Sequence, residues 1–153
     1  MLFSWKNIAV VVKKQKALGK SICFTNGCFD IIHSGHVTYL IKAKRLADIL
    51  IVGLNSDDSV RRLKGEKRPI NDQDDRAIVL SALKPVDYVV IFDQDTPYDL
   101  VKLIKPDIIA KGGDYTPESI VGADLVLDNG GQVIVIPLVE GKSTSNIIEK
   151  AGL

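Results

Sequence analysis

The amino-acid sequence predicts an α/β protein in three layers, with helices on both faces of a five-stranded parallel sheet. Two observations carry this prediction. Apolar runs of strand length alternate with amphipathic segments of helix length about five times along the chain, which is the pattern of parallel sheets with crossover helices. The run at 49–54 is apolar at almost every position, as in strands that are buried on both faces.

The ends of the helices have local reasons in the sequence. Ser4 is expected to cap the first helix, and Gly19 follows its last apolar residue, in the manner of common helix caps and stops. A later helix ends before Pro85, and Ser143 or Thr144 caps the last one. The strands are expected at Ser21–Thr25, Ile49–Leu54, Tyr88–Phe92, Asp107–Ala110 and Gln132–Ile136. The helices are expected at 5–18, Val37–Ala47, Asp72–Leu83, Pro97–Ile104, Gly122–Asn129 and 144–150.

The bulk composition is that of one ordinary globular domain, expected over residues 1–153. Of the 153 residues, 46% are hydrophobic and 25% charged, which excludes a disordered chain. The formal net charge of +1 provides no global field for nucleic acid or an anionic membrane. We therefore expect neither as a partner, and any anionic ligand has to be held by local geometry.

The cysteines and the N-terminal residues indicate a cytoplasmic protein. Cys23 and Cys28 lack the second pair of a zinc site, and reduced thiols are the simplest interpretation. The N-terminal apolar stretch is too short for a signal peptide, and the longest apolar runs are of strand length.

The loop after the first expected strand, 26–36, is the strongest candidate for a ligand site. It joins a strand to a helix start, where backbone N–H groups form an anion site. It contains the only two histidines of the chain, His33 and His36, which project from one side of a helix that begins near Gly35. The loop is neither a dinucleotide fingerprint nor a Walker P-loop. A phosphate-binding pair, a two-histidine metal site and a chance surface pair remain as interpretations.

His33-Ser34-Gly35-His36 after Gly27-Cys28-Phe29-Asp30 resembles the His-x-Gly-His signature of the cytidylyltransferase-like nucleotidyltransferases. The segments 111–115 (Lys-Gly-Gly-Asp-Tyr) and 139–146 (Val-Glu-Gly-Lys-Ser-Thr-Ser-Asn) resemble the heptose 1-phosphate adenylyltransferases within that family. The similarity runs from about Leu18 to the C-terminus. It implies a Rossmann-like fold and the transfer of AMP from ATP to D-glycero-D-manno-heptose 1-phosphate. The products are ADP-heptose, a precursor of the lipopolysaccharide core, and pyrophosphate. In many bacteria this activity is one half of a bifunctional kinase–adenylyltransferase, whereas here it would stand alone.

The resemblance also implies roles for individual residues. His33 and His36, with Lys64, are the expected catalytic donors, and Lys64 and Arg76 are expected to bind the phosphate of the sugar or the triphosphate. Asp30 is expected either to hold Mg²⁺ that accompanies ATP or to fix its loop by hydrogen bonds. Relatives often form dimers, so a homodimer is expected. The expected ATP-binding residues are Asn26, Gly27, Cys28, Phe29, Asp30, His33, Gly35, His36, Lys111, Gly112, Asp114, Glu140, Gly141, Ser143 and Thr144.

Several of these positions also have a purely structural interpretation. Ser143 and Thr144 are ordinary helix caps, and 111–114 is an ordinary glycine turn. The cationic run 61–69 is expected to be a mobile loop that closes over phosphates, or else a solvated loop. Cys28 needs no chemical role, and Lys142 is a cation without an assigned place. Val139 stands where cytidylyltransferase relatives carry an arginine, which disfavours CTP.

Other functions compete with the heptose enzyme. The same chemistry on glycerol 3-phosphate, ethanolamine phosphate or FMN would show as pyrophosphate release with that acceptor. A non-enzymatic nucleotide-binding or flavodoxin-like module leaves the two histidines unexplained. A sugar-nucleotide oxidoreductase lacks its glycine fingerprint.

Overall fold

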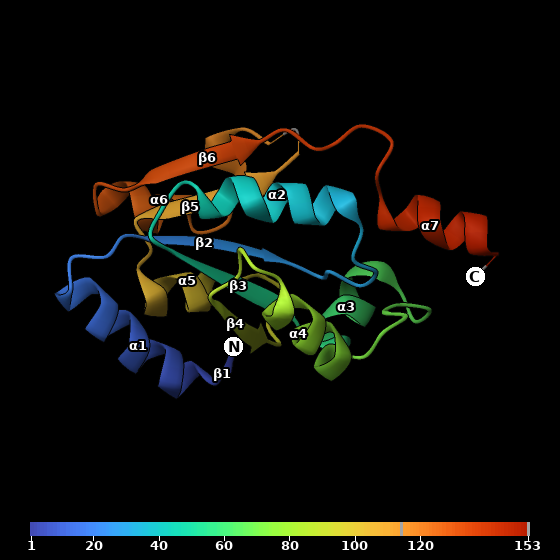
Figure 1. Ribbon diagram of the computed structural model, residues 1–153, viewed down its shortest axis with the longest axis horizontal. Coiled ribbons are helices and arrows are strands. Elements are labelled where there is room, and N and C mark those ends of the chain that lie inside the picture. Colours follow the sequence, from blue (N-terminus) through green and yellow to red (C-terminus); the bar gives the residue numbers. More distant parts are fainter. Residues whose placement is uncertain (114, 153) are drawn as a thin grey trace.

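The computed structural model, which describes residues 1–113 and 115–152, contains a six-stranded parallel sheet between two layers of helices (Figure 1). The order of the strands is β1-β4-β3-β2-β5-β6. The strands are β1 (Leu2–Phe3), β2 (Ile22–Gly27), β3 (Ile49–Asn55), β4 (Tyr88–Phe92), β5 (Ile108–Gly112) and β6 (Gln132–Ile136). The three-layer parallel architecture predicted from the sequence is confirmed.

Each face of the sheet has its own apolar core. Ile8 and Val12 of α1 and Leu100 of α5 pack on one face, whereas Leu40 of α2 and Leu80 of α4 pack on the other. All seven residues of β3 are buried, as expected for a central strand with helices on both sides. The helices are α1 (Trp5–Ala17), α2 (Ser34–Lys44), α3 (Asp57–Lys64), α4 (Gln73–Ala82), α5 (Tyr98–Ile104), α6 (Ala123–Asp128) and α7 (Thr144–Ala151), with a 3-10 turn at Pro117–Ser119.

Two elements differ from the sequence prediction. The sheet has a sixth strand, because Leu2 and Phe3 pair in parallel with Val89 and Val90. Two residues are too few to show a period of two, so only the pairing with a distant strand reveals them. The prediction of a basic loop over 61–69 is wrong for its first half, because 61–64 form the last turn of α3. Ser56 caps this helix by accepting a hydrogen bond from the N–H of Ser59.

The strand order reverses at β2, which places the candidate loop at the ligand-binding end of the sheet. From β2 the chain proceeds through β3 and β4 on one side and through β5 and β6 on the other. Ligands of open parallel sheets bind outside the carboxyl ends of the strands at such a switch point. The β2–α2 loop (28–33), α3 and α7 all lie at this end, at the right of Figure 1.

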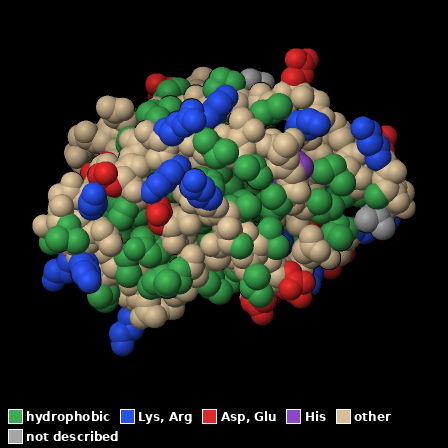
Figure 2. All heavy atoms as spheres, in the orientation of Figure 1, with side chains coloured by type: hydrophobic (Ala, Val, Ile, Leu, Met, Phe, Trp, Pro, Cys, Tyr) green, Lys and Arg blue, Asp and Glu red, His purple; other side chains and the backbone are tan. Residues whose placement is uncertain are grey.

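Positive charge on the visible face of the molecule is not confined to this end. On the face seen in Figure 2, Lys and Arg side chains are spread over the surface with hydrophobic side chains between them.

Candidate functional site

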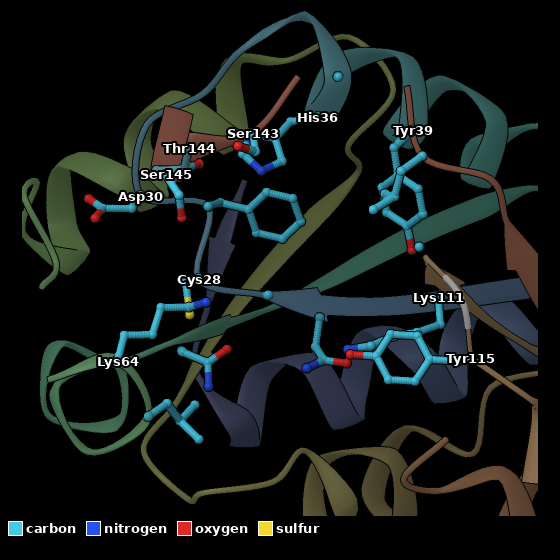
Figure 3. A pocket seen from close by; sticks show the side chains of 18 of the residues that line it. Cys28, Asp30, His36, Tyr39, Lys64, Lys111, Tyr115, Ser143, Thr144 and Ser145 are labelled. Atoms are coloured by element: carbon cyan, nitrogen blue, oxygen red, sulfur yellow. The ribbon is translucent and has the colours of Figure 1, made fainter. Parts of the chain in front are cut away.

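A cavity of about 700 Å³ opens at the carboxyl ends of the strands. Its walls come from the β2–α2 loop, the end of β5, the β6–α7 segment (137–143), the ends of β3 and α3, and the loop that follows β4. In Figure 3, His36, Ser143 and Thr144 lie on one side, Cys28 and Lys64 on a second side, and Lys111 and Tyr115 on a third. The volume is within the range of small-molecule sites.

A buried carboxylate fixes the β2–α2 loop. The Asp30 side chain is 0% exposed and its Oδ2 lies 2.6 Å from Nε of Arg68. The backbone N–H groups of Ile70 and Asn71 donate to the same carboxylate at 2.9 and 3.0 Å, and the Asn71 side chain donates to the Asp30 carbonyl. Burial alone would raise the pKa of Asp30, but these donors outweigh it and lower the pKa below its usual value. The loop is therefore tied to 68–71 before any ligand arrives.

Phe29 gives the loop a strained backbone. Its φ of 45° is left-handed, which is uncommon for a residue other than glycine and costs about 1 kcal/mol or more. The ring lies against the backbone of Gly27, where an added Cβ would approach it to 3.0 Å, and 5.2 Å from the ring of His36. The strain places an aromatic wall beside the histidines.

His33 and His36 face the cavity together at the start of α2. The two rings stack with centroids 3.9 Å apart. His33 is the N-cap of α2, and its Nδ1 accepts a hydrogen bond from the N–H of Gly35 at 3.1 Å. Because Nδ1 is the acceptor, a neutral His33 carries its proton on Nε2. The prediction that both histidines lie on one side of the first turn is confirmed.

The surroundings keep both imidazoles neutral. Burial, with His33 adjacent, lowers the pKa of His36 to about 4, against a small opposing contribution from the Ile31 carbonyl. Burial and the nearby Lys142 lower the pKa of His33. Nδ1 of His36 is buried and has no hydrogen-bond partner among the described residues. An unsatisfied buried nitrogen is costly, so a ligand or water that bonds to it would stabilise the site.

Gly35 leaves room for this arrangement. A Cβ at Gly35 would lie 2.9 Å from the His33 ring and 3.0 Å from Cβ of Lys142. Any side chain there would displace the histidine or the β6–α7 segment. The contact also places Lys142, for which the sequence offered no location, at the edge of the cavity beside His33.

The β6–α7 segment and the start of α7 form the wall beside the histidines, and few contacts hold them. Ser143 caps α7 by accepting from the N–H of Asn146 at 3.1 Å, so the expected cap is confirmed. The hydroxyl of Thr144 donates to the Ile31 carbonyl at 3.4 Å. No residue of α7 is fully buried within the part of the chain that the structure describes.

Two lysines enter the cavity from different elements. Lys64, the last residue of α3, extends toward Cys28 (Figure 3). Lys111 is the last residue but one of β5, its Nζ lies 5.7 Å from the centre of the Tyr115 ring, and burial lowers its pKa. Burial raises the pKa of the Cys28 thiol despite the neighbouring Lys64, Arg76 and Arg68, so Cys28 is a neutral, weakly reactive wall residue.

The structure corrects the place of Arg76. Its side chain is 0% exposed and does not line the cavity. The guanidinium donates to the carbonyls of Asn71, Cys28 and Asn55 and lies 2.8 Å from the Asp57 carboxylate. Because these acceptors occupy the guanidinium, Arg76 holds α3 and the β2–α2 loop in position and does not face a phosphate.

Most of the sequence-predicted site residues meet at the cavity. Those that line it are Asn26, Gly27, Cys28, Phe29, Asp30, His33, Gly35, His36, Lys64, Lys111, Gly112, Ser143 and Thr144. Arg76, Glu140 and Gly141 do not line it, and Asp114 lies outside the described residues. Sequence reasoning missed Asn55, Asp95 and Thr96. Their position in the sequence could have indicated them, because polar residues at or after the ends of buried strands lie at the same edge of a parallel sheet.

The protein residues alone do not form a resident metal site. Within 1–113 and 115–152, no three His, Cys, Asp or Glu side chains are grouped to hold a metal ion. Both oxygens of Asp30 already accept hydrogen bonds from protein donors. The hydrogen-bonding role expected for Asp30 is thus observed, and a metal there would need ligands from elsewhere.

A parallel sheet with a switch point, a His-x-Gly-His turn and a capped helix beside that turn are the features of a nucleotide-binding α/β domain. The chain belongs to the cytidylyltransferase-like family, whose model matches residues 24–150. The resemblance inferred from the motifs is confirmed, and with it the nucleotidyltransferase class.

Curated relatives support the same family at high identity. "Bifunctional protein HldE" of Pelobacter propionicus is 59% identical over 143 residues, which are 94% of this chain and 29% of that protein. The protein of the same name from Wolinella succinogenes is 56% identical over 97% of this chain and 31% of its own length. The chain therefore spans under one third of these relatives.

Solved structures resemble the chain as well. The lipopolysaccharide core biosynthesis protein from Thermoplasma volcanium superposes with a TM-score of 0.63 at 31% identity, covering 81% of this chain and all of that one. Pantothenate synthetase from Thermus thermophilus superposes with a TM-score of 0.66 at 15% identity, covering 95% and 66%. The second likeness concerns the fold alone. In the described part of the chain, no helix has the length and apolar character needed to cross a membrane.

Proposed function

We propose that the chain is an adenylyltransferase that transfers AMP from ATP to D-glycero-D-manno-heptose 1-phosphate and releases pyrophosphate. The observation that carries the proposal is the stacked pair His33 and His36, with centroids 3.9 Å apart, which lies beside the capped N-terminus of α7 in one cavity. Imidazole N–H groups and helix N-termini are donors suited to phosphate oxygens. The motif resemblance, the HldE relatives and the printed role of the Thermoplasma protein in lipopolysaccharide core biosynthesis support the heptose acceptor.

The reaction needs positioning and charge stabilisation more than a base. A sugar phosphate is already anionic near neutral pH, since its second pKa is about 6. Its oxygen attacks the α-phosphorus of ATP, the new P–O bond forms, and the bond to the pyrophosphate oxygen breaks. Donors that meet the charge developing on the α-phosphate and on pyrophosphate then lower the barrier.

The described residues divide this task. His36, kept neutral by burial, donates an N–H to the α-phosphate. Ser143 and Thr144 hold the outer phosphates at the start of α7. Lys64 supplies the mobile cation for the transferred or the attacking phosphate. Mg²⁺ would be held chiefly by the phosphates of ATP, where it neutralises charge on the leaving pyrophosphate.

The wider expectations belong to this proposal. A homodimer, a single domain over 1–153 and a place in the cytoplasm, where ATP is available, remain predictions. Size-exclusion chromatography with light scattering measures the first directly.

The test is initial pyrophosphate release with ATP or CTP and with heptose 1-phosphate or glycerol 3-phosphate. ATP should exceed CTP by at least about tenfold in kcat/KM, a difference of about 1.4 kcal/mol. Val139 has no side-chain donor for a pyrimidine edge, and heptose 1-phosphate should exceed glycerol 3-phosphate as acceptor. If CTP with glycerol phosphate is the fastest pair, the substrate proposal is wrong and the family stands.

A further inference from the structure

The candidate lysine Lys64 lies at the free end of a short helix. α3 spans eight residues. Its first turn is held from inside the protein, because Arg76 bonds the Asp57 carboxylate at 2.8 Å and the side-chain oxygen of Gln73 accepts from the N–H of Asp57 at 3.1 Å. The last turn, 61–64, is exposed and is followed by Gly65 with a φ of 94°.

Arg62 is the residue that binds this last turn to the adjacent β4–α5 loop. Its Nε lies 2.7 Å from Oδ1 of Asp95, and its Nη2 donates to the backbone carbonyl of Asp93. Asp95 lines the cavity in the β4–α5 loop (93–97). The guanidinium thus spans two residues of that loop, and the planar fork of arginine suits two acceptors at once.

The same loop is tied to the start of α3. The hydroxyl of Ser56, the N-cap of α3, donates to the Asp93 carboxylate. The hydroxyl of Ser59 donates to the Gln94 carbonyl at 3.1 Å. The β4–α5 loop therefore follows α3 along its length, and Arg62 is the contact nearest to Lys64.

Beyond Lys64 the chain is next fixed by Arg68, whose Nε lies 2.6 Å from Asp30. Lys64 therefore lies between two tethers, one at Arg62 and one at Arg68. Arg61 lies in the same turn, but its side chain pairs with Asp58 of the same helix at 2.7 Å. Among the described residues it does not tie α3 to another element by an ion pair.

We infer that Arg62 is a positioning residue for phosphoryl transfer: by clamping the end of α3 to Asp93 and Asp95, it aims Lys64 at the phosphates and sets the width of the cavity on that side. The inference rests on the proposed function for its catalytic part. Its structural part, the clamp, stands on the contacts alone. Misplacing a catalytic group by about 1 Å costs up to about a hundredfold in rate, so the loss of the clamp should be visible in kcat.

The test compares Arg62→Gln with Arg61→Gln. The two arginines are adjacent, equally charged and almost equally exposed, at 45% and 43%, and they differ in whether they reach the β4–α5 loop. Arg62→Gln should lower kcat about tenfold, equivalent to about 1.4 kcal/mol, and change the KM for ATP less than about twofold. Among the described residues, the hydrogen-bond partners of Arg62 are in the β4–α5 loop, away from the walls at α2 and α7 that are proposed to bind ATP. Arg61→Gln should keep the kcat of the wild type, and Arg62→Lys should recover part of the loss because it keeps one contact.

Two further measurements separate a clamp from a general charge effect. Hydrogen exchange without substrates should speed up at 61–64 and 93–97 in Arg62→Gln and stay unchanged in Arg61→Gln. Raising the salt concentration to about 1 M screens exposed ion pairs, so the ratio of wild-type to Arg62→Gln kcat should fall toward one.

Equal kcat and equal exchange in the two glutamine variants would overturn the inference. If the wild type releases no pyrophosphate with any phosphate acceptor, the proposed function fails, while the exchange difference still decides whether the clamp exists.

Discussion

Two walls of the same cavity carry the phosphate-binding candidates, and they are held very differently. The β2–α2 loop is tied down by Asp30, whose side chain is 0% exposed, and by Arg76, which donates to the Cys28 carbonyl at 2.7 Å. Among the described residues, the β6–α7 segment and α7 are hydrogen-bonded to that loop once, from the Thr144 hydroxyl to the Ile31 carbonyl at 3.4 Å. No described residue of α7 is fully buried.

The difference indicates that the two walls have different roles in the reaction. Donors that act on developing charge are most effective when they are rigid before the substrate arrives, and His33 and His36 are built on the fixed wall. A wall that closes on the nucleotide has to open again for product release, and Ser143 and Thr144 are on the loosely held wall.

The largest expected effect is on the fixed wall. His36→Ala should lower kcat at least about a hundredfold, the scale of losing one transition-state donor, with a much smaller change in the KM for ATP. Steady-state pyrophosphate release measures both constants. A variant that keeps more than half of the wild-type kcat would remove His36 from catalysis and, with it, the reason for a rigid wall.

A second substitution tests the rigidity itself. Asp30→Asn should lower the free energy of unfolding by about 2 kcal/mol. This is below the range of about 3–5 kcal/mol for breaking a fully buried pair, because the Arg68 side chain is 15% exposed and still reaches water. Chemical denaturation measures the change, and Asp58→Asn, which breaks the exposed pair with Arg61, is the matched control at under about 0.5 kcal/mol. Equal losses in the two variants would contradict the description of a fixed wall.

The pH dependence of stability follows from the same burial. The pKa of His36 is about 4 in the folded protein against 6.5 as the ordinary value, so between these values the unfolded chain binds a proton that the folded protein does not. Stability should therefore fall as the pH drops from 7 to 5, by about 1 kcal/mol after allowing for partial exposure. His36→Ala should flatten this slope in urea titrations. An unchanged slope would mean that His36 titrates normally.

The smallest effect should appear on the loose wall and on the basic loop. With ATP and Mg²⁺, hydrogen exchange should slow at 139–148 and at 65–67, and change little at 28–33, which is already fixed. The sequence predicted a mobile loop over 61–69. The structure reduces the segment expected to be mobile to 65–67, because 61–64 belong to α3 and Arg68 is paired with Asp30. Equal slowing across both walls would erase the contrast between them.

Features that depend on neighbours in the sequence could be predicted from the sequence. The alternation of strands and helices, the caps at Ser4 and Ser143, and the placement of His33 and His36 on one side of Gly35 involve residues a few positions apart. Hydrophobic period and capping act over that range. The strand Leu2–Phe3 shows the limit, since it exists through its pairing with Val89 and Val90.

Only the tertiary structure decided which charges meet. The partner of Asp30 is 38 residues away and that of Arg62 is 33 residues away, and nothing local distinguishes Arg62 from Arg61. Arg76 is buried and bonded to three carbonyls, and the pKa of His36 is about 4. Both properties depend on burial and on partners that come from segments far apart in the sequence. The sequence determined which chemistry could gather at the switch point, and the packing of the chain determined which side chains remain free to perform it.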